Sequence, residues 1–396
     1  MDMVKTHIWL NEPTERDGCL RVSAVLERPN HEKQALWYDI PEEHSFLVTP
    51  SGDAFVIGNI FLIMASGVEC VLHGNLSPSL LRNLSEFQAA WSCWRPGKYK
   101  QVSISAETEI EELEAELPAV AIAAFSGGVD SAYTIFRHTI GSCPEHWKRN
   151  IQAGLFVKGF DIPLDHGDAF DRAKQKIEST LDDVGVKLIT MSTNLHDLNI
   201  EWDDTHIAGL ASTLMLFRGH YNEGLIASGP AYSRLVLPWG SNPVTDHLLS
   251  SKNFQIVHDS TGVSRVEKIK ELPVWKIGYS NLRICFSAER RDENCGKCAK
   301  CIMDILLMRL ENIPQPASYP ELTNNDLSKL TIPTEHQFHS LSSVVTYARE
   351  HKIVGEWIQI LDRRIQQLTH EKKNLSAPKS KIQKLLSLFD RSSGTS

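Results

Sequence analysis

The segment Ala119-Val120-Ala121-Ile122-Ala123-Ala124-Phe125 runs directly into Ser126-Gly127-Gly128-Val129-Asp130-Ser131. Its first half is a continuous apolar run, which is typical of a strand buried on both faces at the centre of a parallel sheet. Its second half joins that strand to a predicted helix over residues 132–139. The order of strand, glycine-rich turn and helix places the turn at the carboxyl end of a strand, where open α/β sheets bind their ligands.

The following 100 residues repeat this alternation. Apolar runs at 153–157, 186–190 and 224–228 predict three more strands, and amphipathic patterns predict helices over about 167–183 and 205–220. Strands that alternate with helices form βαβ units, whose crossovers make the strands parallel. The sequence therefore predicts an α/β fold with a doubly wound parallel sheet.

The segments on either side differ in pattern. Residues 1 to about 105 predict a β-rich region, with short apolar runs at 54–57 and 60–63 as strands and one helix that begins near Ser77-Pro78. Six glutamates in residues 107–116 predict a solvated linker. Helices are expected over 302–312 and over most of 340–369, followed by a frayed tail from 371. We therefore predict three domains, 1–106, 117–312 and 313–396.

Composition limits the partners of the chain. Its formal net charge is −8, so a general nucleic-acid-binding role is not expected. The chain contains no apolar run of about 18 residues that would predict a membrane span. Its first residues lack the apolar stretch of a secretory signal. These features predict a cytoplasmic protein without a membrane partner.

The turn at 126–131 has the composition of a phosphate-binding loop. Its glycines allow close approach of the backbone to an anion, and the next helix points its free N–H groups and positive dipole end at the same place. Ser126 and Ser131 can donate hydroxyl hydrogen bonds, while Asp130 either holds Mg²⁺ or shapes the loop. A Gly-Lys-Ser/Thr ending is missing, so this is not a Walker A loop. The predicted ATP-binding residues are Ser126, Gly127, Gly128, Val129, Asp130 and Ser131.

Four of the eight cysteines form a second motif, Cys285-x9-Cys295-x2-Cys298-x2-Cys301. Four thiolates can complete a tetrahedral shell around Zn²⁺, which leaves no open position for water and predicts a structural site. An iron–sulfur cluster uses the same number of cysteines and stays open as an alternative.

The loop resembles the PP-loop, Ser-Gly-Gly-x-Asp-Ser, of N-type ATP pyrophosphatases. Together with the cysteine motif it is similar to the QueC family of 7-cyano-7-deazaguanine synthases, over about residues 119–312. The resemblance implies a sheet of the adenine-nucleotide α-hydrolase type. It also implies adenylation of the carboxylate of 7-carboxy-7-deazaguanine, followed by attack of ammonia to form an amide and a second activation to the nitrile.

The same resemblance assigns further residues. Residues 205–213 correspond to a helix that faces the nucleotide, and Arg265 and Lys268 are expected to neutralise phosphate or pyrophosphate. Together with Asp130, they are the predicted catalytic residues. The Gly-Tyr-Pro-Asp-Cys-Arg-type stretch that the family associates with the deazaguanine is missing after the fourth strand. In its place we expect Asp246 to pair with a guanine-like edge and Trp239 or Tyr232 to stack on the base.

The added terminal segments resemble those of longer QueC-like proteins in bacterial anti-phage operons, the QatC group and the type IV CBASS systems. That likeness implies transfer of the base to an amine of a partner protein from the same operon, docked by the N-terminal domain, and self-association is compatible with it. Two other functions stay open. One is an adenylating sulfur transferase that acts on a tRNA base, and the other is a nucleotide-binding module without catalysis.

Overall fold

The computed structural model describes residues 5–111, 119–198, 201–285, 288–332 and 335–376. Contacts divide the chain into two compact units, residues 1–294 with 316–318, and residues 295–315 with 319–396. Part of the predicted linker, residues 112–118, lies outside the described residues, as does most of the predicted frayed tail, residues 377–396. The two units are described separately below.

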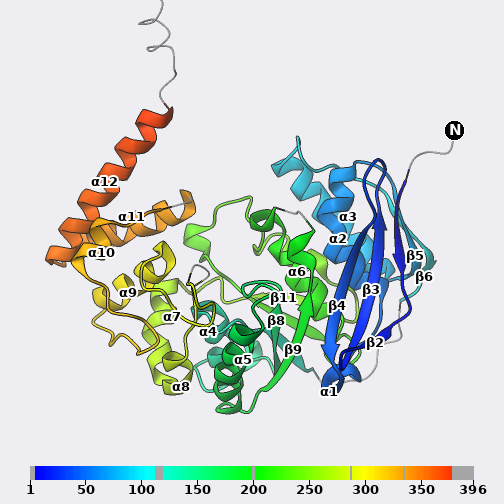
Figure 1. Ribbon diagram of the computed structural model, residues 1–396, viewed down its shortest axis with the longest axis horizontal. Helices are drawn as coiled ribbons and strands as arrows, with labels where there is room; N and C mark the ends of the chain where they lie inside the picture. Colours follow the sequence, from blue (N-terminus) through cyan, green and yellow to red (C-terminus); the bar gives the residue numbers. More distant parts are fainter. Residues whose placement is uncertain (1–4, 112–118, 199–200, 286–287, 333–334, 377–396) are drawn as a thin grey trace, which may run out of the picture. The chain divides into compact units, whose positions relative to one another are not determined.

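The first unit contains one large sheet, whose described strands follow the order β11-β10-β7-β8-β9-β4-β3-β1-β5-β6, with β2 paired to β3 (Figure 1). The part of the sheet that contains the predicted nucleotide loop is parallel, as predicted. The strands of this part are β7 (Ala121–Ala124), β8 (Ile151–Lys158), β9 (Lys187–Thr193), β10 (Glu223–Ala227) and β11 (Gln255–Asp259). They are connected by α4 (Val129–His138), α5 (Gly167–Asp182) and α6 (Trp202–Met215).

The spatial order β9-β8-β7-β10-β11 shows that the chain starts at the centre and is then wound in both directions. From β7 it proceeds outward through β8 and β9, and then returns to the other side of β7 with β10 and β11. This is the 3-2-1-4-5 order of a doubly wound sheet, in which the direction of winding reverses beside the first strand. The reversal lies between β7 and β10.

The N-terminal segment extends the same sheet. Its strands are β1 (Thr6–Leu10), β2 (Thr14–Arg16), β3 (Cys19–Glu27), β4 (Gln34–Pro41), β5 (Cys70–Leu76) and β6 (Ile104–Glu109). Strand β4 pairs antiparallel with β9, placing Tyr38 opposite Thr193 and Asp39 opposite Ser192. The sheet is therefore mixed and mostly parallel. The predicted domains 1–106 and 117–312 both contribute strands to this one sheet. The division of the chain into three domains stays a prediction.

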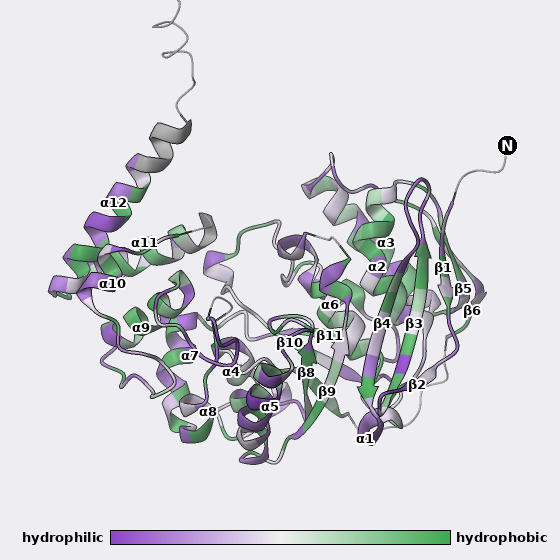
Figure 2. Ribbon diagram, in the orientation of Figure 1, coloured by the Kyte–Doolittle hydropathy of each residue, from purple (hydrophilic) through white to green (hydrophobic). Residues whose placement is uncertain are grey.

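One prediction for this segment is wrong. The apolar runs at 54–57 and 60–63 are not strands but parts of one helix, α2 (Gly52–Ser66). Nearly all its residues are buried, so it is hydrophobic around its whole circumference and its pattern has no helical period to detect. Ser51 caps its start by accepting a hydrogen bond from the Asp53 N–H, and Gly67 ends it with a φ of 67°. By contrast, residues in β3 and β4 alternate between the two faces of the sheet (Figure 2).

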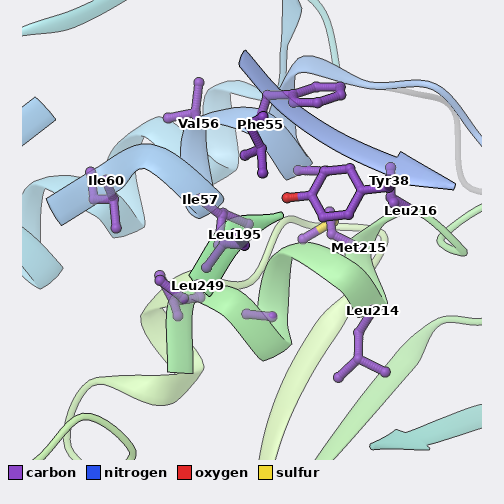
Figure 3. Packing of buried hydrophobic residues seen from close by; sticks show 14 of the residues in the cluster. Tyr38, Phe55, Val56, Ile57, Ile60, Leu195, Leu214, Met215, Leu216 and Leu249 are labelled. Carbon is purple, nitrogen blue, oxygen red and sulfur yellow. The ribbon is translucent and has the colours of Figure 1, made fainter. Parts of the chain in front are cut away.

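Helix α2 packs against α6, so the N-terminal segment and the parallel part of the sheet share one hydrophobic core. Figure 3 shows Phe55 and Ile57 of α2 beside Leu195, Met215 and the ring of Tyr38. The Tyr38 hydroxyl donates to Ser212 Oγ at 3.0 Å, and burial raises the pKa of this phenol. A buried hydroxyl that finds its partner across the core ties β4 to α6.

The remaining elements of the first unit are short, apart from α3 (Pro78–Trp94), which confirms the predicted helix after Ser77. They are α1 (Glu42–Ser45), α7 (Arg265–Glu271), α8 (Lys276–Ser280) and the 3-10 turns Glu145–Trp147, Leu195–Asp197, Tyr232–Arg234, Asp246–Leu249 and Leu272–Val274.

The second unit is helical, as predicted for the C-terminal region. It contains α9 (Ala299–Leu310), α10 (Asn324–Ser328), α11 (Glu335–Glu350) and α12 (Glu356–Ser376). Helix α11 packs on α9 and α12, and α10 packs on α12. Buried polar contacts reinforce the apolar ones, such as the Tyr319 hydroxyl that donates to Asp304 at 3.1 Å. None of the helices described in either unit combines the length and hydrophobicity of a bilayer-spanning segment.

Gly159 provides a test of the turn that follows β8. Its φ is +99°, and a Cβ there would lie 2.0 Å from the carbonyl oxygen of Thr193. We expect Gly159→Ala to lower the free energy of unfolding by about 2–4 kcal/mol in urea titrations, because strain and overlap with backbone add. Gly97→Ala, where nothing lies within 4 Å of the added Cβ, is the control and should leave stability within about 1 kcal/mol. Equal stability of both variants would contradict the described turn.

Candidate functional site

The loop at residues 126–131 lies at the carboxyl end of β7, the central strand, and leads into α4. Strand β7 pairs with β8 on one side and with β10 on the other. Because the winding reverses between β7 and β10, their following segments diverge and leave a crevice at this edge in folds of this kind. The predicted nucleotide loop therefore lies where a doubly wound sheet binds its ligand.

The glycines give the loop its conformation. Gly127 has a φ of 77°, which side chains disfavour, and Gly128 occupies the N-cap of α4 with extended backbone. Gly128 has no side chain that could cap α4, whose N-terminus carries the positive end of the helix dipole. Ser131 Oγ donates to Gly128 O at 3.2 Å and lies 3.4 Å from Ser126 Oγ. Both predicted hydroxyls therefore lie together within the loop.

The structure brings the three predicted catalytic residues into direct contact. The Asp130 carboxylate accepts hydrogen bonds from Arg265 at 2.6 Å and from Lys268 Nζ at 3.0 Å. Lys268 is fully buried, and its ammonium also donates to the carbonyl oxygen of Ser228 at 2.6 Å, at the end of β10. A buried ammonium requires such partners. This arrangement supports a loop-shaping role for Asp130, while its binding of Mg²⁺ stays a prediction.

The orientation of Arg265 and Lys268 follows from the start of α7. Ser264 Oγ accepts from the Glu267 N–H at 3.3 Å, and the Glu267 carboxylate accepts from the Ser264 N–H at 2.7 Å. This capping box defines where the helix begins. Residues 265 and 268 are three positions apart, so they lie on one face of the helix, and that face meets α4.

Arg283 is a site residue that sequence reasoning missed. Its backbone N–H donates to Gly127 O at 2.8 Å, and its guanidinium donates to Ser126 O at 3.1 Å and to Asp161 at 3.4 Å. The side chain is only 5 % exposed. The signal available in the sequence was an arginine between two apolar residues, Leu282 and Ile284. Such a position suggests a buried arginine, and charged residues are rarely buried unless they are paired. Asp161, which follows β8, lies beside this guanidinium.

A buried carboxylate, that of Asp259 at the end of β11, holds α4, the helix that follows the loop. It accepts hydrogen bonds from Thr134 at 2.8 Å and from Arg137 and His138 at 3.2 Å each. His138 Nδ1 accepts from the Arg149 N–H, so its Nε2 carries the proton that Asp259 accepts. Burial alone would raise the pKa of Asp259, but the hydrogen bonds and positive charge of these partners outweigh it and lower this pKa.

The predicted substrate residues lie in different environments. Tyr232 is 65 % exposed, whereas the Asp246 side chain is fully buried. Asp246 already accepts from Ser241 Oγ, from the Asn242 N–H and from His258, so its pairing with a base stays a prediction that requires these bonds to change. Trp239 packs edge-on against His206, at 5.5 Å between ring centroids.

The four predicted cysteines form a cluster whose sulfur atoms all lie within 4.8 Å of one another. Tetrahedral Zn²⁺ with Zn–S distances of about 2.3 Å needs sulfurs about 3.8 Å apart, and Cys295 Sγ and Cys301 Sγ are separated by 3.9 Å. The backbone N–H groups of Lys297 and Cys298 point at Cys295 Sγ. Such N–H donors stabilise thiolates, and Gly296 allows the tight turn with a φ of 68°. The residues therefore fit a structural zinc ion.

We expect one zinc ion per chain in the purified protein, measured by mass spectrometry of the metal. Cys295→Ser should lose it and should lower the melting temperature, because metal binding to the folded state contributes to stability. Cys93→Ser, a change of an exposed cysteine outside the cluster, should retain the metal. Iron with visible absorbance would instead support the iron–sulfur alternative.

Asp259 predicts a pH dependence of stability. A carboxyl whose pKa is lowered by folding stabilises the protein above its unfolded pKa of about 4, and this contribution is lost as the pH falls through the folded pKa. Urea unfolding between pH 7 and pH 3 should therefore show a loss of stability towards acid. Asp259→Asn should be less stable at pH 7 and should show a shallower acid limb. An unchanged acid limb would contradict this assignment.

Comparisons with known proteins identify no relative of this chain. No family model matches it, and no curated protein or solved structure shows significant similarity. The residues at the carboxyl edge of the sheet and the cysteine cluster are therefore the features that bear on function.

Proposed function

We propose that this protein is an ATP-dependent ligase that adenylates a carboxylate and then forms a C–N bond, releasing pyrophosphate and AMP. The observation that carries the proposal is the position of the loop 126–131 at the reversal of the sheet, with Asp130 bound to two cations from α7. The PP-loop resemblance of the same six residues, and the adenine-nucleotide α-hydrolase type of sheet that it implies, agree with the observed strand order.

The charges around the loop suit cleavage between the α- and β-phosphates. Arg265, Lys268 and Arg283 lie against two carboxylates, Asp130 and Asp161, so cations outnumber carboxylates among these five side chains although the chain has a net charge of −8. Leaving pyrophosphate accumulates negative charge, and fixed cations stabilise it without reorganisation. Mg²⁺, held with the help of Asp130, would supply further neutralisation of the phosphates.

Adenylation has a clear chemical purpose. A carboxylate is a poor electrophile at neutral pH, and its conversion to an acyl-adenylate introduces AMP as a good leaving group. The protein then contributes mainly by holding the reactants in the correct geometry. Zinc at the four cysteines would have a structural role, because four protein ligands leave no position for a substrate.

The QueC-like resemblance selects the substrate. We propose 7-carboxy-7-deazaguanine as the acid, with ammonia or an amine of a partner protein as the nucleophile and an amide, or by a second activation a nitrile, as the product. The N-terminal segment, which extends the sheet through β4, would present a surface for such a partner in anti-phage defence.

The adenylation step is tested by ATP–pyrophosphate exchange, with Mg²⁺, labelled pyrophosphate and 7-carboxy-7-deazaguanine. We expect exchange that depends on the acid, and AMP as the nucleotide product when ammonia is added. Asp130→Asn and Lys268→Met should each lower the exchange rate by about 100-fold or more, since both remove fixed charge at the loop.

Asp182→Asn and Lys187→Met, which alter exposed residues of the same types on α5 and β9, are matched controls and should retain full exchange. Circular dichroism melts would show whether a loss of exchange reflects unfolding. Absence of exchange and of AMP in the wild-type protein, with ATP bound, would refute the proposed activity on this acid.

A further inference from the structure

The loop Trp239–Asp246 is folded around one buried carboxylate. Asp246 accepts hydrogen bonds from Ser241 Oγ at 2.7 Å, from the Asn242 N–H at 2.8 Å and from His258 Nδ1 at 2.7 Å. The Asn242 side chain braces the loop, because its Oδ1 accepts from the N–H groups of Val244 and Thr245. Asp246 is therefore held rigidly, and the side chain that it orients is His258.

This contact selects the tautomer of the neutral imidazole. Because Nδ1 donates to Asp246, neutral His258 carries its lone pair on Nε2. The side chain is 5 % exposed, and Nε2 is buried without a hydrogen-bond partner among the described residues. Unpaired buried polar atoms are rare in folded proteins, and a catalytic role is one of the reasons for which they persist. A carboxylate that orients a histidine with a free Nε2 is the arrangement of a general base.

His258 also lies at the correct edge of the sheet. It is the penultimate residue of β11 and pairs in register with Ile226 of β10. The next residue, Asp259, accepts through its carbonyl oxygen from the Ser228 N–H at 2.8 Å, and the Ser228 carbonyl in turn accepts from Lys268. The pair formed by Asp246 and His258 is thus connected to the loop 126–131 through the ends of β10 and β11.

The side chains of His258 and Asp259 lie on opposite faces of β11 and contact different elements. Neighbouring side chains in a strand point to opposite faces. The Asp259 side chain contacts α4, so His258 lies on the other face, where the Asp246–Leu249 turn packs against β11 and α6. On that face Gly240 lies tightly against the ring of His206, and a Cβ at Gly240 would be 2.4 Å from it. The Asp246 and His258 side chains are both buried, so bulk water has little access to them.

We propose that His258, oriented by Asp246, accepts the proton of the amine that attacks the acyl-adenylate. This inference rests on the proposed function. In the step, the nitrogen of ammonia forms a bond to the acyl carbon, the bond from that carbon to the AMP oxygen breaks, and AMP leaves with the electron pair. One proton passes from the nitrogen to His258 Nε2, and the Asp246 carboxylate stabilises the imidazolium. His258 is the catalytic residue of this step and Asp246 a positioning residue.

The test separates the two halves of the reaction in the full-length protein. ATP–pyrophosphate exchange with 7-carboxy-7-deazaguanine reports adenylation, and amide formation reports attack by ammonia. Hydroxylamine is a free base at neutral pH and captures acyl-adenylates as hydroxamates without base catalysis. We expect His258→Gln to keep exchange and hydroxamate formation within about 3-fold of wild type and to slow amide formation by about 100-fold or more.

Asp246→Asn should show the same separation, because it acts through His258. His247→Gln, a change of the exposed neighbouring histidine, is the matched control and should leave both half-reactions unchanged. His258→Asn provides a second variant, and thermal melts establish that each protein is folded.

Three outcomes would overturn the inference. Amide formation at the wild-type rate in folded His258→Gln would show that no base is needed there. Equal losses of exchange, hydroxamate and amide would show a purely structural histidine. Either result would leave the proposed adenylation standing, whereas absence of exchange in the wild-type protein would remove both.

Discussion

The central strand β7 has almost no side-chain surface that water reaches. Ala121, Ile122 and Ala123 are fully buried, so the backbone groups on both edges must be paired by neighbouring strands and both faces must be covered by helices. Strands β8 and β10 satisfy the edges, while α4 and α6 both contact β7. Three alanines among its four residues allow these helices to approach closely. Covering this strand on all sides requires the chain to wind in two directions, and that winding creates the edge at which the loop lies.

Backbone carbonyl groups, as well as carboxylates, hold the positively charged side chains at this edge of the sheet. The carbonyl oxygens of Ser126 and Ser228, at the ends of β7 and β10, accept hydrogen bonds from Arg283 and Lys268. Each carbonyl fixes a cation that would otherwise be costly to bury. The strand ends therefore position the positive groups, and Asp130 joins α7 to the loop. These charges are held by hydrogen bonds within the fold, which is the condition that electrostatic stabilisation in the proposed adenylation would require.

The N-terminal segment is part of this architecture. Its helix α2 and strand β4 share a core with α6, the helix that also packs against the Asp246–Leu249 turn. The hydrogen bond from the Tyr38 hydroxyl to Ser212 also joins β4 to α6. A series of packed elements, α2, α6 and the Asp246–Leu249 turn, therefore joins the N-terminal segment to the face of β11 that carries His258.

The sequence alone determined the features that depend on neighbouring residues. The apolar strand, the glycine turn, the alternation of strands and helices and the cysteine spacing are local patterns, and the described structure contains each of them. Helix α2 was missed because a segment buried on every side has no hydrophobic period. Tertiary structure alone decided that β4 joins β9, that Arg283 lies against the loop and that Asp246 orients His258. Those contacts join residues up to about 160 positions apart, and only the packing of the sheet brings them within hydrogen-bond distance.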